Sequence, residues 1–149
     1  MLYQLFIGSI VISLTIVVQG VFVGLAITLL TRLGPWLASP SHAIRTILAL
    51  IGSTLWMLAA ISVCTWIWAL TFMAVGAINE LEPALYFSIV AFTTLGFGDI
   101  TLSTPWRVLS GITAANGLLA IGLSTAFLVS LFDRLQGIRQ LRDDQLQGE

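Results

Sequence analysis

Long apolar segments dominate the pattern of this chain. Three of them, at residues 2–30, 44–78 and 106–132, are each long enough for a helix to cross a bilayer core, which takes about 20 residues. Gly34, Pro35 and Pro40 mark a polar break after the first segment, and residues 79–83 form a second break. The pattern predicts an all-α membrane protein with three transmembrane helices.

The chain divides accordingly into four parts. We expect a transmembrane helix at 1–31, a loop at 32–43, a larger membrane unit at 44–132 and a charged tail at 133–149. The tail has a weak helical pattern, so both a bundle with its own copies and a frayed end stay open. Gln19, in the first helix, is expected to hydrogen-bond another helix. Polar residues along 106–132 either line water or make similar bonds.

A short apolar segment lies between the second and third spans. Ala84 to Thr93 is too short to cross the bilayer, but it suits a re-entrant helix that is buried in protein. Pro83 favours its first turn, and the acidic residues Glu80 and Glu82 complement its N-terminal dipole. Its C-terminal end would point partial negative charge towards whatever follows it.

The stretch after this helix alternates glycine with bulky residues. Gly96 and Gly98 tolerate φ of either sign, so successive residues can alternate in handedness and turn their carbonyls to one side. Rings of such carbonyls can replace the hydration shell of a cation. One chain supplies one strand of such a ring, so the unit must be an oligomer, and closed cyclic symmetry is the usual arrangement.

Residues 83–99, PALYFSIVAFTTLGFGD, resemble the pore helix and selectivity filter of tetrameric potassium channels, whose signature reads TTVGYGD. The resemblance extends over roughly residues 44–132. It implies a pore module with an outer helix at 44–78, a pore helix at 83–93, a filter at 94–99 and an inner helix at 105–132. It also implies a homotetramer with the filter on its axis.

The same resemblance implies roles for individual residues. Potassium ions would bind carbonyls of the filter, Thr94, Leu95, Gly96, Phe97 and Gly98, and the hydroxyl of Thr94. Thr93, Tyr86 and Asp99 would support the filter, with Tyr86 placed to reach Asp99. On the inner helix, Gly117 corresponds to a hinge, Ile121 and Thr125 to the cavity, Val129 to the inner constriction and Asp133 to the cytoplasmic mouth.

Two filter residues and one neighbour depart from the family pattern. Leu95 replaces the usual valine, Phe97 the usual tyrosine, and Val90 a carboxylate that some relatives carry. Phe97 therefore lacks a phenol that could bond the pore helix, and Asp99 lacks that acid as a partner. These changes leave the degree of potassium selectivity open.

Only 9% of the residues are charged, and arginine supplies all six basic ones. Arg32, Arg45, Arg134, Arg139 and Arg142 would lie on one side of the membrane and Arg107 on the other. Because positive residues stay cytoplasmic, we expect a multi-pass protein of the cell membrane, a bacterial inner membrane, with its N-terminus outside and its tail inside. The filter would then face outside.

A potassium-selective channel is therefore the predicted function. The alternatives are a non-selective or sodium-permeable cation channel, a potassium transporter subunit and a non-conducting interaction subunit; transporters usually carry four pore loops in one chain. Residues 2–78 hold no acid–base or metal set within the spans, so we predict no enzyme activity. We expect no cofactor beyond permeant K⁺ and no nucleic-acid partner, while a regulatory subunit stays open.

Overall fold

The computed structural model describes residues 2–37 and 42–147. In this part of the chain the elements are α1 (Leu2–Leu37), α2 (His42–Ala74), α3 (Leu81–Phe92), η1 (Thr104–Trp106, a 3-10 turn) and α4 (Arg107–Gln147). Three segments are long and apolar enough to cross a membrane: Leu2–Arg32, Ile44–Ala74 and Thr104–Arg134. The all-α fold with three long apolar helices is confirmed.

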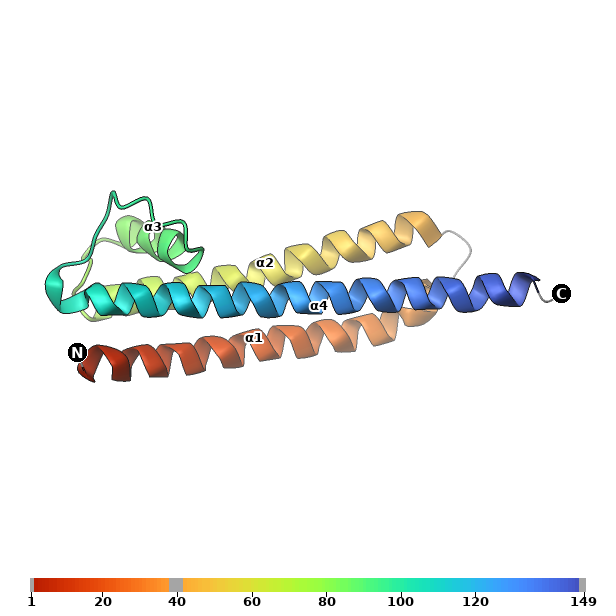
Figure 1. The fold of residues 1–149 in the computed structure, drawn as a ribbon, viewed down its shortest axis with the longest axis horizontal. Helices are drawn as coiled ribbons and strands as arrows, with labels where there is room; N and C mark the ends of the chain where they lie inside the picture. Colours follow the sequence, from red (N-terminus) through yellow and green to blue (C-terminus); the bar gives the residue numbers. More distant parts are fainter. Residues whose placement is uncertain (1, 38–41, 148–149) are drawn as a thin grey trace.

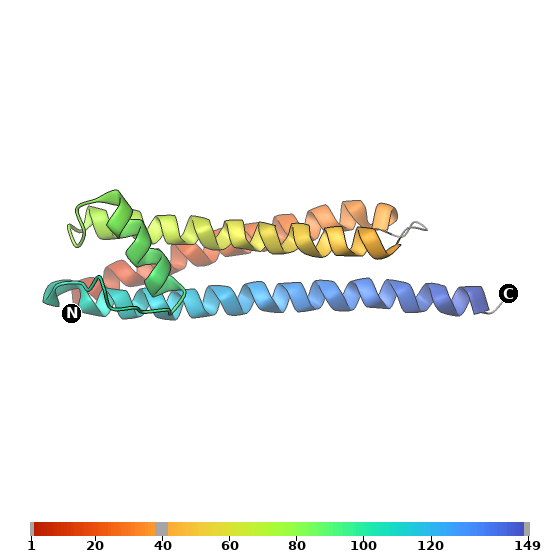
Figure 2. The same ribbon diagram turned by 90° about the horizontal axis from the view of Figure 1, so that it is seen from above.

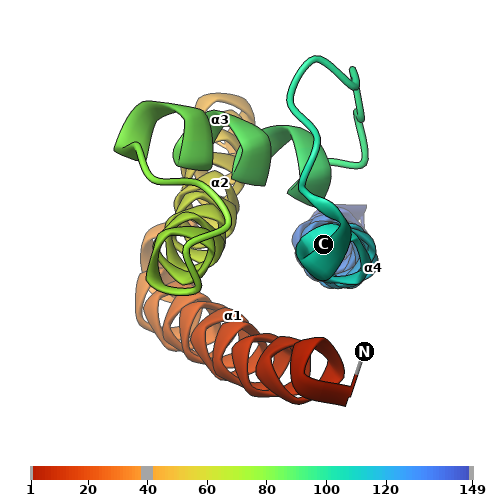
Figure 3. The same cartoon turned by 90° about the vertical axis from the view of Figure 1, so that its left-hand side faces the viewer.

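The three long helices run along a common axis, and the short α3 lies near one end of them (Figure 1). The N-terminus is at the same end as α3, and the C-terminus is at the opposite end. Viewed along the axis, α1 and α2 lie side by side, with α3 over α2 and reaching towards α4 (Figure 3). This order follows from three successive spans that alternate in direction.

Helix α2 ends at Ala74, four residues before the boundary at 78 predicted from the apolar pattern. Gly76 has a φ of +69°, which a residue with a side chain rarely adopts. Its N–H donates to the Met73 carbonyl at 3.0 Å, and the Ala77 N–H donates to the Phe72 carbonyl at 2.9 Å. These two bonds form a Schellman motif, which ends the helix while the chain is still apolar.

The loop predicted at 32–43 is shorter in the structure, because α1 continues to Leu37 and α2 begins at His42. Gly34 and Pro35, which were expected to break the helix, lie instead in the last turn of α1. Residues 38–41 of the predicted loop lie outside the described part of the chain.

Helix α4 begins later and ends much later than predicted. Thr104 and Pro105 form the 3-10 turn, so the α-helix starts at Arg107 rather than 105. It then runs past 132 to Gln147 and extends beyond the ends of α1 and α2 (Figure 1). Leu, Gln and Arg, which are good helix formers, fill much of this extension. The predicted tail therefore continues the inner helix, and its last two residues, 148–149, are not described.

The main core lies beneath α3. Trp68 and Phe72 of α2 are fully buried and pack with Phe87 and Phe92 of α3 and with Leu109 of α4. The rings of Phe72 and Phe87 meet edge to face with centroids 5.1 Å apart. This aromatic packing fixes α3 against the long helices, and so fixes where the segment after α3 begins.

Candidate functional site

Helix α3 crosses from α2 to α4, and the segment that follows it returns along α4 (Figure 2). The helix starts after Glu80, whose extended backbone accepts a 3.1 Å hydrogen bond from the Ala84 N–H. Glu82 lies in its first turn, where a negative charge complements the helix dipole. Its last residue, Phe92, is fully buried. The helix is therefore held at both ends.

Backbone hydrogen bonds tie the start of the predicted filter to the end of α3. The Thr94 N–H donates to the Ala91 carbonyl at 3.0 Å, and the Leu95 N–H donates to the Val90 carbonyl at 3.0 Å. The Thr93 hydroxyl donates to the Ile89 carbonyl at 2.7 Å. Since these bonds involve the last turn of α3, the position of Thr94 and Leu95 follows that of α3.

The filter backbone alternates in handedness. The φ values of Thr94, Gly96 and Gly98 are +61°, +58° and +80°, so every second residue from 94 to 98 has a positive φ. Gly96 and Gly98 thus adopt the left-handed conformation that the alternating glycines predicted. The positive φ of Thr94 was not anticipated, because a β-branched residue is rarely found there. Within residues 2–37 and 42–147, it is the one non-glycine residue with a positive φ.

Tyr86 and Asp99 meet at the outer end of this segment. The Tyr86 phenol donates a 2.6 Å hydrogen bond to Oδ2 of Asp99, the contact expected from the sequence. This bond lowers the pKa of the Asp99 carboxyl, because it stabilises the charged form. It also raises the pKa of the Tyr86 phenol. The bond joins the middle of α3 to the residue that directly follows Gly98.

Tyr86→Phe tests this link through its pH dependence. The lowered pKa of Asp99 means that its carboxylate, and with it the hydrogen bond, persists below the ordinary aspartate pKa of about 3.9 and is lost only as pH falls through the lowered pKa. Without the phenol, the Asp99 pKa should rise towards its ordinary value. We expect the pKa of the Asp99 carboxyl, followed by NMR titration, to be higher in Tyr86→Phe than in the wild type. Superimposable titration curves would show that the Tyr86 phenol does not stabilise the Asp99 carboxylate.

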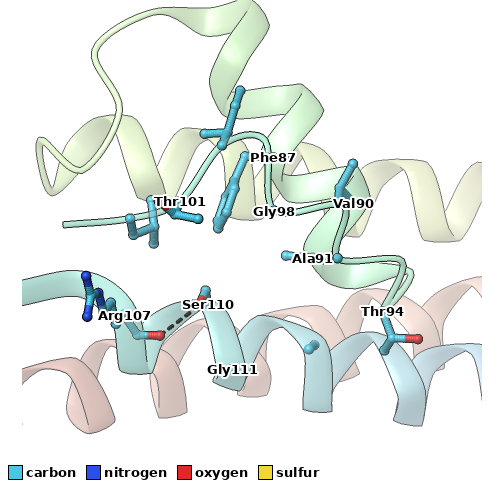
Figure 4. A pocket seen from close by; sticks show the side chains of 13 residues that line it. Phe87, Val90, Ala91, Thr94, Gly98, Thr101, Arg107, Ser110 and Gly111 are labelled. Atoms are coloured by element: carbon cyan, nitrogen blue, oxygen red, sulfur yellow. Dashed lines mark hydrogen bonds between the residues drawn. The ribbon is translucent and has the colours of Figure 1, made fainter. Parts of the chain in front are cut away.

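A hollow of about 550 Å³ separates the filter from the first turns of α4 (Figure 4). Phe87, Gly98 and Thr101 lie on one side of it, and Arg107, Ser110 and Gly111 on the other. The Ser110 hydroxyl donates to the Arg107 carbonyl at 2.7 Å. The filter side chains Leu95 and Phe97 do not line this hollow and are 57% and 66% exposed. The single chain therefore leaves large apolar side chains of the filter uncovered.

Gly117 lies where α4 crosses the end of α3. A Cβ atom at this position would overlap the carbonyl oxygen of Phe92 and would lie 2.5 Å from its carbonyl carbon. The glycine is therefore required for close contact between two backbones. Helix α4 continues through Gly117 without interruption. The sequence suggested a hinge here and gave no signal of this contact, because nothing in the pattern shows which helix faces residue 117.

The remaining predicted pore residues follow one stripe of α4 below Gly117. Ile121 is half-buried, and Thr125, Val129 and Asp133 are exposed. The Thr125 hydroxyl donates to the Ile121 carbonyl of its own helix at 2.9 Å. No other part of the described chain covers this stripe fully, so it is free to face either water or a second copy.

Comparison with known proteins places the chain in a family. A family model described as "Ion channel" matches residues 56–134. The potassium voltage-gated channel protein Shal of Drosophila melanogaster is 32% identical over 66 residues, which is 44% of this chain and 12% of that protein. The chain thus corresponds to a small part of this relative. No solved structure gives a significant match.

The matched region begins in α2, contains α3 and the filter, and ends in α4. It covers just over half of the chain. It overlaps most of residues 44–132, over which the sequence resembles potassium channels. The chain therefore belongs to this family of ion channels.

Proposed function

We propose that the chain forms a homotetrameric potassium channel with residues 94–98 as its selectivity filter. The observation that carries this proposal is the alternation of positive φ at Thr94, Gly96 and Gly98, directly after a short helix that packs against the spans. Alternate handedness allows the carbonyls of successive residues to face one axis. The name of the Drosophila relative, a potassium channel, agrees with this ion.

In this proposal the filter binds K⁺ through backbone oxygens. Carbonyls of Thr94, Leu95, Gly96 and Phe97, with the Thr94 hydroxyl, replace the water around each ion, and ions in adjacent sites repel one another onward. The C-terminal end of α3 directs its partial negative charge towards the inner end of the filter. No side-chain carboxylate is required to bind the ion.

The exposed side chains Leu95 and Phe97 support an oligomer. Large apolar groups beside an ion path would be unfavourable in water, and a neighbouring copy would cover them. Four copies around the filter axis close the ring of carbonyls. Below the filter, Ile121, Thr125, Val129 and Asp133 would line the route to the cytoplasm, with Gly117 as the point where α4 could bend.

We do not assign a voltage sensor to this chain. Arg32 is the single charged residue of α1, so this helix has no series of charges that a membrane potential could move. The arginine distribution favours a cytoplasmic C-terminus and an external filter.

A weakly selective cation channel is the second candidate. Phe97 has no hydroxyl for a hydrogen bond to α3, and Val90 offers no acid to Asp99. Within the described chain, the side-chain bond that supports the outer filter is the one from Tyr86 to Asp99. A filter with fewer supporting bonds holds its carbonyls less firmly and discriminates less between K⁺ and Na⁺.

Reconstitution tests the proposal. Purified protein in lipid vesicles loaded with K⁺ should release K⁺ down its gradient, and native mass spectrometry should give the mass of four copies. Vesicles with Gly98→Ala protein serve as the control and should retain K⁺. A monomeric or dimeric protein, or equal release by both proteins, would contradict a tetrameric pore that uses this filter.

A further inference from the structure

Polar side chains from three helices meet in the interior of the membrane-spanning part. Thr15 and Gln19 of α1, Cys64 of α2, and Asn116 and Ser124 of α4 are each at least 95% buried. These positions lie near the middle of the three spans. Burying so many polar groups far from the membrane surfaces is costly unless each group finds a partner.

The polar groups are joined by hydrogen bonds between helices. The Asn116 side-chain N–H donates to the Thr15 hydroxyl at 2.7 Å. Gln19 Nε2 donates to the Ser124 hydroxyl at 2.6 Å and to the Ala120 carbonyl at 3.1 Å. The Cys64 thiol lies 3.9 Å from Oε1 of Gln19 and makes a weak bond to it. We refer to Thr15, Gln19, Asn116 and Ser124 as the polar clamp.

The polar clamp restricts how α1 and α4 can move past each other. Apolar side chains in lipid gain little from one helix position over another, because lipid tails offer similar contacts. Hydrogen bonds have defined directions and lengths, and the two sets of bonds lie two helical turns apart on α4. Sliding or rotation of α4 against α1 would break both sets together.

The clamp also reaches the filter. Asn116 bonds to α1, while its neighbour Gly117 contacts the backbone of Phe92, the last residue of α3. Thr93 and Thr94 follow Phe92 directly. Two adjacent residues of α4 therefore connect α1 on one side with the inner end of the filter on the other.

We propose that α1 is a regulatory element that controls channel opening by fixing the position of α4 through the polar clamp. The clamp stabilises the position of α4 seen here relative to others. A displacement of α1 in the membrane would therefore change the balance between open and closed channels. This role rests on the proposed channel function and adds a purpose for the helix that precedes the pore module.

Removing the clamp should change gating. In planar bilayers, Gln19→Leu and Ser124→Ala should shift the ratio of open to closed time in the same direction, on the order of tenfold for Gln19→Leu. The double variant should shift it no further than Gln19→Leu alone, because the inter-helix bond that Ser124→Ala removes is already lost in Gln19→Leu. Thr28→Val is the matched control: the Thr28 hydroxyl is exposed and bonds the Gly24 carbonyl of its own helix.

Fixing the clamp should have the opposite effect. Thr15→Cys combined with Asn116→Cys, in a Cys64→Ala background, can be joined by a short bifunctional thiol reagent. The cross-link should move the open-to-closed ratio opposite to Gln19→Leu, relative to the same protein before treatment. This arm replaces the Thr15–Asn116 hydrogen bond by a covalent link and keeps Gln19, so it does not depend on the folding of Gln19→Leu.

The outcomes separate the two proposals. A conducting wild type whose open-to-closed ratio is no more affected by Gln19→Leu than by Thr28→Val would overturn the clamp and leave the channel function standing. Shifts in the same direction on loosening and on cross-linking would also overturn it. A wild type with no current would contradict the channel function itself, and the clamp with it.

Discussion

Gly117→Ala is expected to prevent stable folding of the protein. The new Cβ would overlap the carbonyl oxygen of Phe92 and would lie 2.9 Å from the Cα atom of Phe92. These are backbone atoms at the end of α3, so the clash cannot be relieved by a side-chain rotation. Overpacking of this kind costs about 3 kcal/mol or more, since α4 or α3 must shift as a whole.

Two other glycines provide graded controls for this prediction. Gly122, on the same helix, has open space around its position, so Gly122→Ala should leave thermal stability in detergent unchanged or slightly raised. At Gly8, a Cβ would meet the Cδ1 and Cγ2 atoms of Ile112, each at 2.8 Å, and these side-chain atoms can shift more easily than backbone. Gly8→Ala should therefore give an intermediate loss. Equal melting temperatures for Gly117→Ala and Gly122→Ala would show that α4 and α3 are farther apart than described.

Gly96→Ala is expected to abolish potassium current while the protein still folds. Gly96 has a φ of +58° in open space, so alanine meets no clash but must adopt a left-handed conformation. That costs about 1–2 kcal/mol, which reduces the population of the filter conformation by roughly five- to thirtyfold in each chain. In a tetramer the cost applies four times to one pore, and current should fall below detection.

Gly76→Ala is the matched control because it bears a similar backbone cost outside the filter. Gly76 has a φ of +69°, open space around it and a place at the end of α2. We expect a modest loss of stability and an unchanged potassium current per folded channel. If both variants lost current equally, the effect of Gly96→Ala would reflect folding rather than the filter.

Element types could be predicted from the sequence, whereas their ends could not. The apolar runs located all three spans and the short helix before the filter. Helix α2 ends at Ala74 because Gly76 adopts a positive φ. Gly76 lies inside an apolar run, so the hydropathy pattern alone does not show that the helix stops there. The extension of α4 to Gln147 could not be located from hydropathy, because the charged residues after 132 end the apolar run but do not end the helix.

The candidate site was predictable where chemistry is local in sequence. The conformation of Gly96 and Gly98 follows from the residues of one short segment, and the bond from Tyr86 to Asp99 was expected from the resemblance that this segment carries. The contact of Gly117 with Phe92 and the bond of Thr15 to Asn116 join residues far apart in the chain. For the polar residues of α4, Asn116 among them, the sequence left open whether they line water or bond another helix, and the fold determines that Asn116 bonds α1.

The most direct test of the central claim is the bi-ionic reversal potential in planar bilayers, with K⁺ on one side and Na⁺ on the other. A potassium-selective filter predicts a reversal potential that approaches the potassium equilibrium potential, carried by a current that Gly96→Ala abolishes. A reversal potential near zero would contradict potassium selectivity and would favour a general cation pore with the same architecture.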